Sequence, residues 1–230
     1  MTENRIIVAL DVDSAAEART LVTRLGARVG FYKVGMELYA AAGMDFVREL
    51  VGQGKDVFLD QKYFDIGETV RRAVRVAARG GARFLTVHGS SQVMRAAREG
   101  RGDSALKILA VTVLTSFNQD DLTDMGYDRP IADIIALRVR HAMEAGVDGL
   151  ICSPLDAAVV RALAGPKSII VTPGVRSGGA AQGDQKRVAT PAEAIANGAD
   201  YVVIGRQITR AADPAAAAAR VAEEIAAPCR

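Results

Sequence analysis

The sequence predicts a single (β/α)8 TIM barrel, and three observations lead to this fold class. Eight short apolar runs rich in Val and Ile alternate along the chain with longer segments rich in Ala, Arg and Glu. The apolar runs are nearly continuous, which is typical of parallel strands covered on both faces. The composition does not change along residues 1–230, so we expect one domain, and repeated βα units favour a closed barrel. An open, doubly wound sheet is the structural alternative.

The expected strands are short and recur along the whole chain. Each combines β-branched and other apolar residues and is followed by a polar or Gly-containing connection, as expected for strands of a parallel barrel. They span residues 5–12, 31–36, 55–62, 83–89, 107–115, 149–154, 168–174 and 201–206.

The segments between these strands predict helices with recognisable ends. The first, residues 14–26, begins with Ser14, carries Glu17 three residues later and ends at Gly26. A Ser followed by Glu at this spacing is a capping box, and Gly suits the turn that ends a helix. Similar signals delimit expected helices at residues 67–79, 190–197 and 213–227.

The charge balance and the N-terminal sequence exclude several classes of protein. The 29 basic and 27 acidic residues give a net charge of +2, so there is no general reason to expect a nucleic-acid or membrane partner. The apolar run near the N-terminus is short and ends in two aspartates, unlike a signal peptide. No uncharged apolar run approaches the roughly 20 residues needed to span a bilayer. We therefore expect a soluble, cytoplasmic protein.

The sequence shows no motif for a metal or a nucleotide cofactor. Cys152 and Cys229 are far apart, without the spacing of metal ligands or of a disulfide framework. The two histidines, His88 and His141, lack the ligand spacing of a zinc site. No dinucleotide-binding glycine motif or P-loop is present. We expect no metal and no cofactor, and we expect His88 to be a hydrogen-bonded structural histidine.

Charged residues gather at the C-terminal ends of the first three expected strands, where barrel enzymes carry their catalytic groups. Asp11 ends the first strand, Lys33 lies in the second, and Asp60 and Lys62 end the third, with Asp65 in the loop beyond. Since side chains alternate along a strand, Asp60 and Lys62 share one face. Lysine and aspartate are rarely buried unless paired. The pattern predicts an alternating catalytic array, with a purely structural ion-pair network as the alternative.

A long Gly- and Ala-rich segment follows the seventh expected strand, at residues 173–191, with Arg176 and Gln185 among its polar residues. Loops of this length in compact domains are usually binding loops. The loops after the seventh and eighth strands of such barrels commonly bind phosphate. Gly205 leaves room for a close approach to the backbone, and Arg206 supplies a two-pronged donor. We predict a phosphate site here; a plain surface loop with Arg206 in a surface salt bridge is the alternative.

The order of these motifs resembles the orotidine 5′-phosphate decarboxylase family. Residues 60–69, DQKYFDIGET, resemble the family pattern D-x-K-x-x-D-I-x-x-T, and Asp11 and Lys33 match the first two strands. The D-x-K motif alone would be weak, whereas the ordered set is highly specific and covers essentially the whole chain. The other matching phrases are VTVLTS at 111–116, TPGVR through TP at 172–191, and YVVIGRQI at 201–208.

The resemblance implies a cofactor-free homodimer that converts orotidine 5′-phosphate to uridine 5′-phosphate, the last step of de novo pyrimidine biosynthesis. It implies that Lys62 protonates C6 of the pyrimidine, beside Asp60, and that Lys33 holds the ribose and the charge array. Asp65 and Thr69 are implied to reach the site of the neighbouring subunit. The other implied substrate contacts are Asp11, Thr115, Ser116, Arg176, Gln185, Gly205 and Arg206.

The implied chemistry explains why such an array is needed. Loss of the carboxylate from C6 leaves a carbanion that the ring does not delocalise well, so without a cofactor the protein must stabilise the charge directly. A lysine ammonium does this and then donates the proton, while Asp60 favours the charged form of Lys62. Asp60 also places like charge beside the substrate carboxylate.

Three alternatives to this interpretation remain. A magnesium-dependent sugar-phosphate decarboxylase or aldolase of the same barrel type needs an acidic ligand where this chain has Lys33. A Schiff-base aldolase needs a deprotonated lysine, and a non-catalytic phosphate-binding barrel needs no charge array. The chain also departs locally from the family pattern. Tyr63-Phe64 stands where many bacterial members have Phe-His, and Gly67-Glu68 stands where Pro-Asn is commoner.

Overall fold

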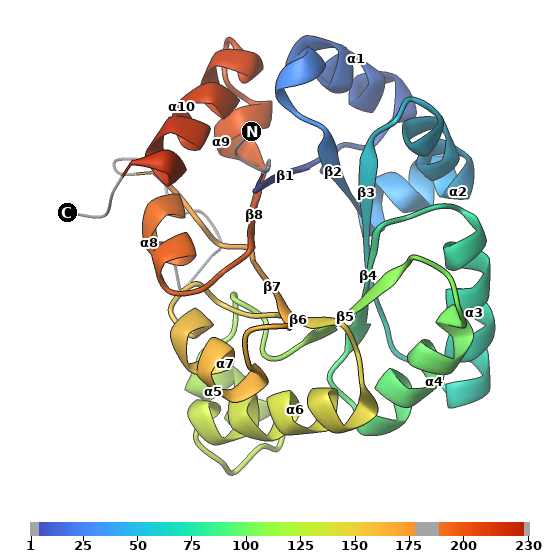
Figure 1. Cartoon of the computed structure of the whole chain (residues 1–230), viewed down its shortest axis with the longest axis vertical. Coiled ribbons are helices and arrows are strands. Elements are labelled where there is room, and N and C mark those ends of the chain that lie inside the picture. Colours follow the sequence, from blue (N-terminus) through green and yellow to red (C-terminus); the bar gives the residue numbers. More distant parts are fainter. Residues whose placement is uncertain (1–4, 178–188, 228–230) are drawn as a thin grey trace.

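The structure is a computed structural model that describes residues 5–177 and 189–227. Its eight parallel strands form one closed barrel in which the strand order β1 to β8 follows the sequence. Helices surround the barrel on the outside (Figure 1). The (β/α)8 fold class predicted from the sequence is confirmed, and the open-sheet alternative is wrong because β1 pairs directly with β8.

The predicted strands are all present, but several end earlier than expected. The fifth strand ends at Val111 because its partner, the sixth strand, ends at Ile151, so the pairing between the two strands stops there. Thr115 and Ser116 therefore lie in the following loop, and Asp11 lies just beyond the first strand. The strands are β1 (Ile6–Ala9), β2 (Phe31–Gly35), β3 (Asp56–Tyr63), β4 (Phe84–His88), β5 (Lys107–Val111), β6 (Gly149–Ile151), β7 (Ile169–Thr172) and β8 (Tyr201–Ile204).

The expected helix ends are confirmed by their caps. The Ser14 hydroxyl accepts the N–H of Glu17, and Thr190 and Glu193 form a reciprocal capping box. The helices are α1 (Ala15–Leu25), η1 (Gly26–Arg28), α2 (Met36–Gly52), α3 (Gly67–Arg79), α4 (Ser91–Arg101), α5 (Gln119–Asp124), α6 (Ile131–Ala145), α7 (Ala157–Ala164), α8 (Pro191–Ala196), α9 (Arg206–Thr209) and α10 (Pro214–Ala226). Across the two described ranges, none of these helices is both long and apolar enough to cross a membrane.

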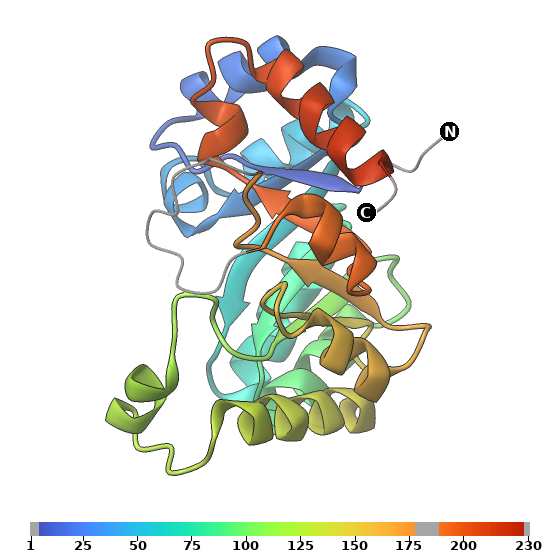
Figure 2. The ribbon, with the colours of Figure 1, turned by 90° about the vertical axis from the view of Figure 1, so that its left-hand side faces the viewer.

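Two apolar layers hold the barrel together. The larger layer lies between the strands and the surrounding helices. The smaller one fills the barrel interior and is built around Phe31, Phe58 and Phe84. Because apolar side chains fill the interior, the charged residues of the pocket lie at one end of the barrel. In the side view, α5 and the loops that follow the strands lie at the end opposite the N-terminus (Figure 2).

Candidate active site

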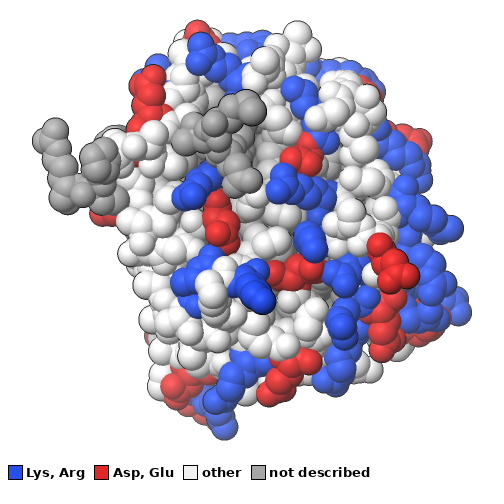
Figure 3. All heavy atoms as spheres, in the orientation of Figure 1, with Lys and Arg blue, Asp and Glu red and all other residues white. Residues whose placement is uncertain are grey.

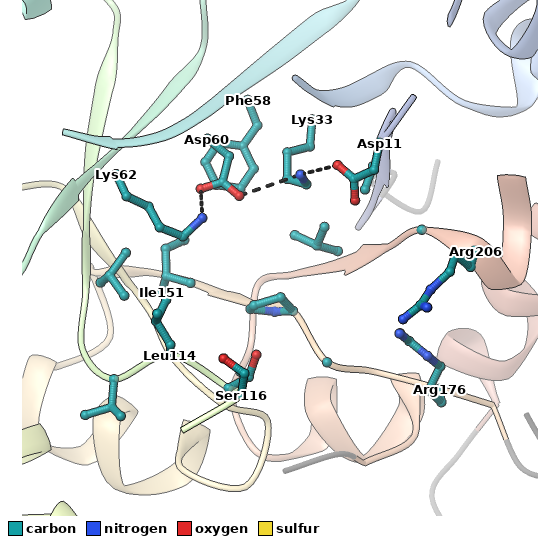
Figure 4. A pocket seen from close by; sticks show the side chains of 18 residues that line it. Asp11, Lys33, Phe58, Asp60, Lys62, Leu114, Ser116, Ile151, Arg176 and Arg206 are labelled. Atoms are coloured by element: carbon teal, nitrogen blue, oxygen red, sulfur yellow. Dashed lines mark hydrogen bonds and ion pairs between the residues drawn. The ribbon is translucent and has the colours of Figure 1, made fainter. Parts of the chain in front are cut away.

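A cavity of about 270 Å³ opens at the C-terminal ends of the strands. Its walls come from the ends of β1, β2, β3, β5, β6 and β8 and from the loops after β5, β7 and β8. Figure 4 shows the lysines and aspartates at one end of this pocket and two arginines at the other. The predicted residues that it brings together are Asp11, Lys33, Asp60, Lys62, Thr115, Ser116, Arg176, Gly205 and Arg206.

The charges at the first end form one continuous chain of ion pairs (Figure 4). Lys33 Nζ lies 2.8 Å from Asp11 Oδ1 and 3.7 Å from Asp60 Oδ2. Asp60 Oδ1 in turn lies 2.8 Å from Lys62 Nζ. Asp60 is thus shared by both lysines, in agreement with the alternating array predicted from the sequence.

Gly35 makes room for the first of these ion pairs. A Cβ atom at this position would lie 2.8 Å from Lys33 Nζ and 3.2 Å from Asp11 Oδ1. Any side chain there would therefore displace the lysine from its carboxylate. Gly35 was not among the predicted site residues, although a glycine at the end of an apolar strand, two residues after a lysine, was a usable signal.

The backbone of Lys62 departs from the regular strand that the sequence analysis assumed. Lys62 has φ +46°, the sole positive φ among non-glycine residues in the described ranges. The pairing of β3 with β4 shifts register between Leu59 and Tyr63, which marks a bulge. Asp60 and Lys62 do meet, as predicted, but on a bulged strand. A left-handed lysine costs on the order of 1–3 kcal/mol, and such strain concentrates at functional sites.

Thr86 on β4 ties the bulge to the charge array and was not predicted. Its side chain is fully buried; the hydroxyl accepts the backbone N–H of Lys62 at 3.0 Å and donates to Asp60 Oδ1 at 2.9 Å. One hydroxyl therefore satisfies the N–H that the bulge releases and fixes the shared carboxylate. The available signal was a small polar residue two positions after Phe84, on the same face of a largely apolar strand.

The electrostatics keep Asp60 ionised. Burial by itself raises the pKa of Asp60. The ammonium groups of Lys33 and Lys62, with hydrogen bonds from Lys62 and Thr86, outweigh this effect and bring the pKa below its ordinary value. The pocket thus presents a carboxylate flanked by two ammonium groups. In residues 5–177 and 189–227, no three His, Cys, Asp or Glu side chains are grouped so as to hold a metal ion.

The opposite end of the pocket carries the two arginines. Arg176 follows β7, Arg206 begins α9, and their guanidinium groups face one another (Figure 4). A Cβ atom on Gly205 would make only ordinary contacts, 3.6 Å from the Ala9 Cβ. Packing within the chain therefore does not require glycine here, and a bound ligand would have room to approach the backbone. Gln185, the other predicted phosphate contact, lies outside the described residues.

The middle of the pocket is apolar, with a polar edge. Phe58, Leu114 and Ile151 line it beside Thr115 and Ser116. A pocket with this lining fits a flat ring whose edge carries hydrogen-bonding groups, positioned between the lysine–aspartate array and the two arginines.

Asp65 and Thr69 do not line the pocket of their own chain. Both are exposed, and Asp65 Oδ1 accepts the N–H of the adjacent Ile66 at 2.6 Å. Phe64 and Ile66, beside them, are 66% and 73% exposed. Two predicted site residues thus lie on the surface, outside the pocket and beside two exposed apolar side chains.

His88 differs from its expectation. Its Nδ1 is buried, and no hydrogen-bond partner for it lies in the described part of the chain, so the expected hydrogen-bonded histidine is wrong for this atom. The ring packs instead on Phe64, with centroids 4.7 Å apart. Burial, followed by the charge of Arg138, lowers the pKa of His88, which favours the neutral imidazole.

Known proteins match this chain over most of its length. The family model for the orotidine 5′-phosphate decarboxylase / HUMPS family matches residues 4–221. An orotidine 5′-phosphate decarboxylase of Rhodopseudomonas palustris strain HaA2 is 52% identical over 97% of this chain and 95% of that protein. One from Caulobacter sp. strain K31 is 52% identical over 96% of this chain and 97% of that protein.

Solved structures agree. The crystal structure of orotidine 5′-phosphate decarboxylase from Lactobacillus acidophilus superimposes with a TM-score of 0.87 at 36% identity, covering 98% of this chain and 100% of that one. An uncharacterised conserved protein from Geobacillus kaustophilus gives a TM-score of 0.83 at 37% identity, covering 96% and 99%.

Proposed function

The chain belongs to the orotidine 5′-phosphate decarboxylase / HUMPS family, and from this membership we propose how its pocket carries out the reaction. It decarboxylates orotidine 5′-phosphate in pyrimidine biosynthesis. The observation that carries the proposal is the pocket itself, which has a shared-carboxylate lysine array at one end and two arginines at the other.

The substrate orientation that we propose follows from this asymmetry. The phosphate dianion binds Arg176 and Arg206, since guanidinium groups match phosphate oxygens in geometry and charge. Gly205 leaves space for it, and Gln185 is the further contact that the resemblance implies. The ribose then lies over Asp11 and Lys33.

The pyrimidine fills the apolar middle of the pocket, with its polar edge toward Thr115 and Ser116. This orientation directs C6 and its carboxylate toward Lys62 and Asp60, at the end of the pocket remote from the arginines (Figure 4). The reacting carbon and the phosphate are thus held by different groups.

In the proposed reaction, the bond between C6 and its carboxylate breaks and CO₂ leaves. The bonding electron pair stays on C6 as a vinyl carbanion. The ammonium group of Lys62 stabilises this charge and then transfers its proton to C6, giving uridine 5′-phosphate; solvent reprotonates the lysine. Protein charges fixed in advance stabilise a developing anion more effectively than water, which must reorganise.

Asp60 has two roles in this proposal. It holds Lys62 Nζ at 2.8 Å, so that the proton donor is fixed before the substrate arrives. Because its pKa is held below the ordinary value, it remains an anion beside the substrate carboxylate. Repulsion between these two groups is relieved when CO₂ leaves.

We further propose that the active form is a homodimer to which Asp65 and Thr69 contribute across the interface. Both residues are exposed and lie outside the pocket of their own chain. The exposed Phe64 and Ile66 give the same surface the apolar character of an interface. One domain over residues 1–230, and a cytoplasmic location as for other enzymes of nucleotide synthesis, belong to the same proposal.

The test is a spectrophotometric assay of orotidine 5′-phosphate consumption with excess chelator and no added cofactor. We expect full activity under these conditions, because the proposed chemistry uses only side chains of the protein. Loss of activity with chelator, restored by magnesium, would instead support the magnesium-dependent alternative. Borohydride treatment with substrate separates the Schiff-base alternative, since only an imine would be trapped on lysine.

A further inference from the structure

A hydrogen-bonded group joins the two segments that carry the arginines. Ser177 directly follows Arg176, and Gln207 directly follows Arg206. The Gln207 side chain contacts Ser177 twice: its Oε1 accepts the Ser177 backbone N–H at 3.1 Å, and its Nε2 donates to Ser177 Oγ at 2.6 Å. The immediate neighbours of the two arginines are therefore bonded directly to each other.

Glu224 on α10 completes this group. The Ser177 hydroxyl donates to Glu224 Oε2 at 2.5 Å. The direction of every bond is thereby fixed, from the Gln207 amide to the Ser177 hydroxyl to the carboxylate. A carboxylate acceptor strengthens such a bond, and all three side chains are half-buried, where competition from water is reduced.

The backbone beside each arginine is anchored on a second side as well. Val175, before Arg176, is fully buried, and the Arg176 N–H donates to the Ala189 carbonyl at 3.0 Å. Ile208, after Gln207, is also fully buried. These contacts fix each segment to the barrel, and the Ser177–Gln207 bonds fix the two segments to each other.

Such a connection is needed because the two guanidinium groups repel one another. They face each other across one end of the pocket (Figure 4), Arg176 Nη1 also donates to the Val175 carbonyl at 2.7 Å, and like charges repel one another. Two segments free to move apart would lose the spacing that lets both arginines bind one phosphate. A misplacement of about 1 Å at such a site can cost on the order of 100-fold in rate.

We propose that Ser177, Gln207 and Glu224 are positioning residues that hold Arg176 and Arg206 at the spacing a phosphate group requires. This inference rests on the proposed function, because it assumes that the two arginines bind the phosphate of the substrate. None of the three residues lines the pocket, so they act through the arginines.

The first experiment uses Gln207→Leu in the full-length enzyme. We measure kcat and KM for orotidine 5′-phosphate and the inhibition constants of uridine 5′-phosphate and of uridine, which lacks the phosphate. We expect kcat/KM and the affinity for uridine 5′-phosphate to fall about 10- to 100-fold, with inhibition by uridine unchanged. A general loss of packing would instead weaken both inhibitors alike.

Matched variants separate the effect of losing the Gln207–Ser177 hydrogen bonds from a general loss of stability. Gln119→Leu removes a similar two-pronged amide bridge, to the Arg129 carbonyl at 3.1 Å and the Ile131 N–H at 2.8 Å, on a helix that does not line the pocket. It is expected to bind both inhibitors as the unmodified enzyme does. Glu224→Leu should weaken the binding of uridine 5′-phosphate more than Glu224→Gln does, because glutamine keeps an acceptor for Ser177.

If Gln207→Leu fails to fold, Ser177→Ala takes its place, because it keeps the backbone bond to Gln207 and loses only the hydroxyl bonds. Its affinity for uridine 5′-phosphate should fall roughly threefold or more relative to its affinity for uridine. Unchanged affinity for uridine 5′-phosphate in these variants, or an equal loss for both inhibitors, would overturn the positioning role.

Arg206→Ala tests the underlying phosphate assignment separately. If this variant binds uridine 5′-phosphate as well as the unmodified enzyme does, the proposed function fails at the phosphate site. If Arg206→Ala loses that affinity and Gln207→Leu keeps it, the phosphate site stands and the positioning proposal is wrong.

Discussion

The two ends of the barrel use charge in opposite ways. At the end where the strands begin, the Arg83 guanidinium lies over the rings of Phe31, Phe84 and Tyr201, 5.3 to 5.6 Å from their centroids. It also donates to Asp56 at 2.6 Å and to the Tyr201 hydroxyl at 2.8 Å. This arginine is satisfied within the chain and covers the aromatic residues of the barrel interior.

Other ion pairs at this end are equally complete. The Asp148 carboxylate accepts from Arg101 and Lys107 and from the backbone N–H of Ile108. Asp200 likewise accepts from Arg161 and from a backbone N–H of β7. In Figure 3, basic and acidic side chains lie beside one another around the centre of this face.

At the end where the strands finish, the charges are arranged for a ligand. Asp60 is shared by two lysines, the backbone of Lys62 is strained, and an open cavity separates this array from a pair of arginines. Charges satisfied away from the cavity stabilise the fold, whereas we expect the charges that line the cavity to contact a substrate. The comparison predicts that substitutions at the two ends affect different quantities.

The largest effect is expected for Lys62→Ala. Removing both the stabilising ammonium group and the proton donor should lower kcat by on the order of 10⁴-fold or more. Substrate binding should be largely kept, because the phosphate contacts remain. Single-turnover assays with a binding measurement check this, and an active Lys62→Ala enzyme would mean that another group donates the proton.

Arg206→Ala should give the next largest loss. Binding energy at the remote phosphate supports the transition state, so turnover of orotidine 5′-phosphate should fall by several orders of magnitude, on the order of 10³-fold. Steady-state kinetics measure this directly. A normal turnover number would remove the phosphate assignment.

Arg83→Leu should have the reverse profile, with a normal kcat and reduced stability. The variant loses the hydrogen bonds and the ring contacts of a half-exposed guanidinium group, so the free energy of unfolding should fall by about 1–2 kcal/mol. Urea unfolding measures the loss, and Arg83→Lys, which keeps only the charge, should be intermediate. A large drop in kcat with unchanged stability would contradict the division between the two ends.

Lys62→Gly, compared with Lys62→Ala, tests the backbone strain at Lys62 separately from the loss of its amine. Both Lys62→Gly and Lys62→Ala should be inactive, but glycine adopts φ +46° without steric cost. The glycine variant should therefore be about 1 kcal/mol more stable to urea than the alanine variant. Equal stability would mean that the left-handed backbone at this position stores no strain.

The smallest effect concerns pH and His88. Burial lowers the pKa of this histidine in the folded protein, so below the ordinary histidine pKa of about 6.5 the unfolded chain binds more protons than the folded one. The stability contributed by neutral His88 is present above this pH and is lost as the pH falls below it. Urea unfolding at pH 8 and pH 5.5 should show a larger decrease for the unmodified protein than for His88→Gln.

The sequence by itself determined the barrel and most of the residues that meet in its pocket. The order of strands is encoded locally, and a parallel barrel brings their C-terminal ends to one rim, so Asp11, Lys33, Asp60 and Lys62 could be grouped without coordinates, although the strand ends themselves could not be placed. The motif spacing also identified Arg176 and Arg206 at the other end of the same pocket.

Only the tertiary structure decided the contacts between distant segments. Thr86 meets Asp60 across 26 positions because β3 and β4 pair, and Arg83 meets Tyr201 across 118 because closure of the barrel brings distant strands together. The left-handed Lys62 depends on the bulge between β3 and β4, and the Ser177–Gln207 bonds depend on how two loops pack. Such partners follow from three-dimensional register and not from residue type, so no local pattern in the sequence could specify them.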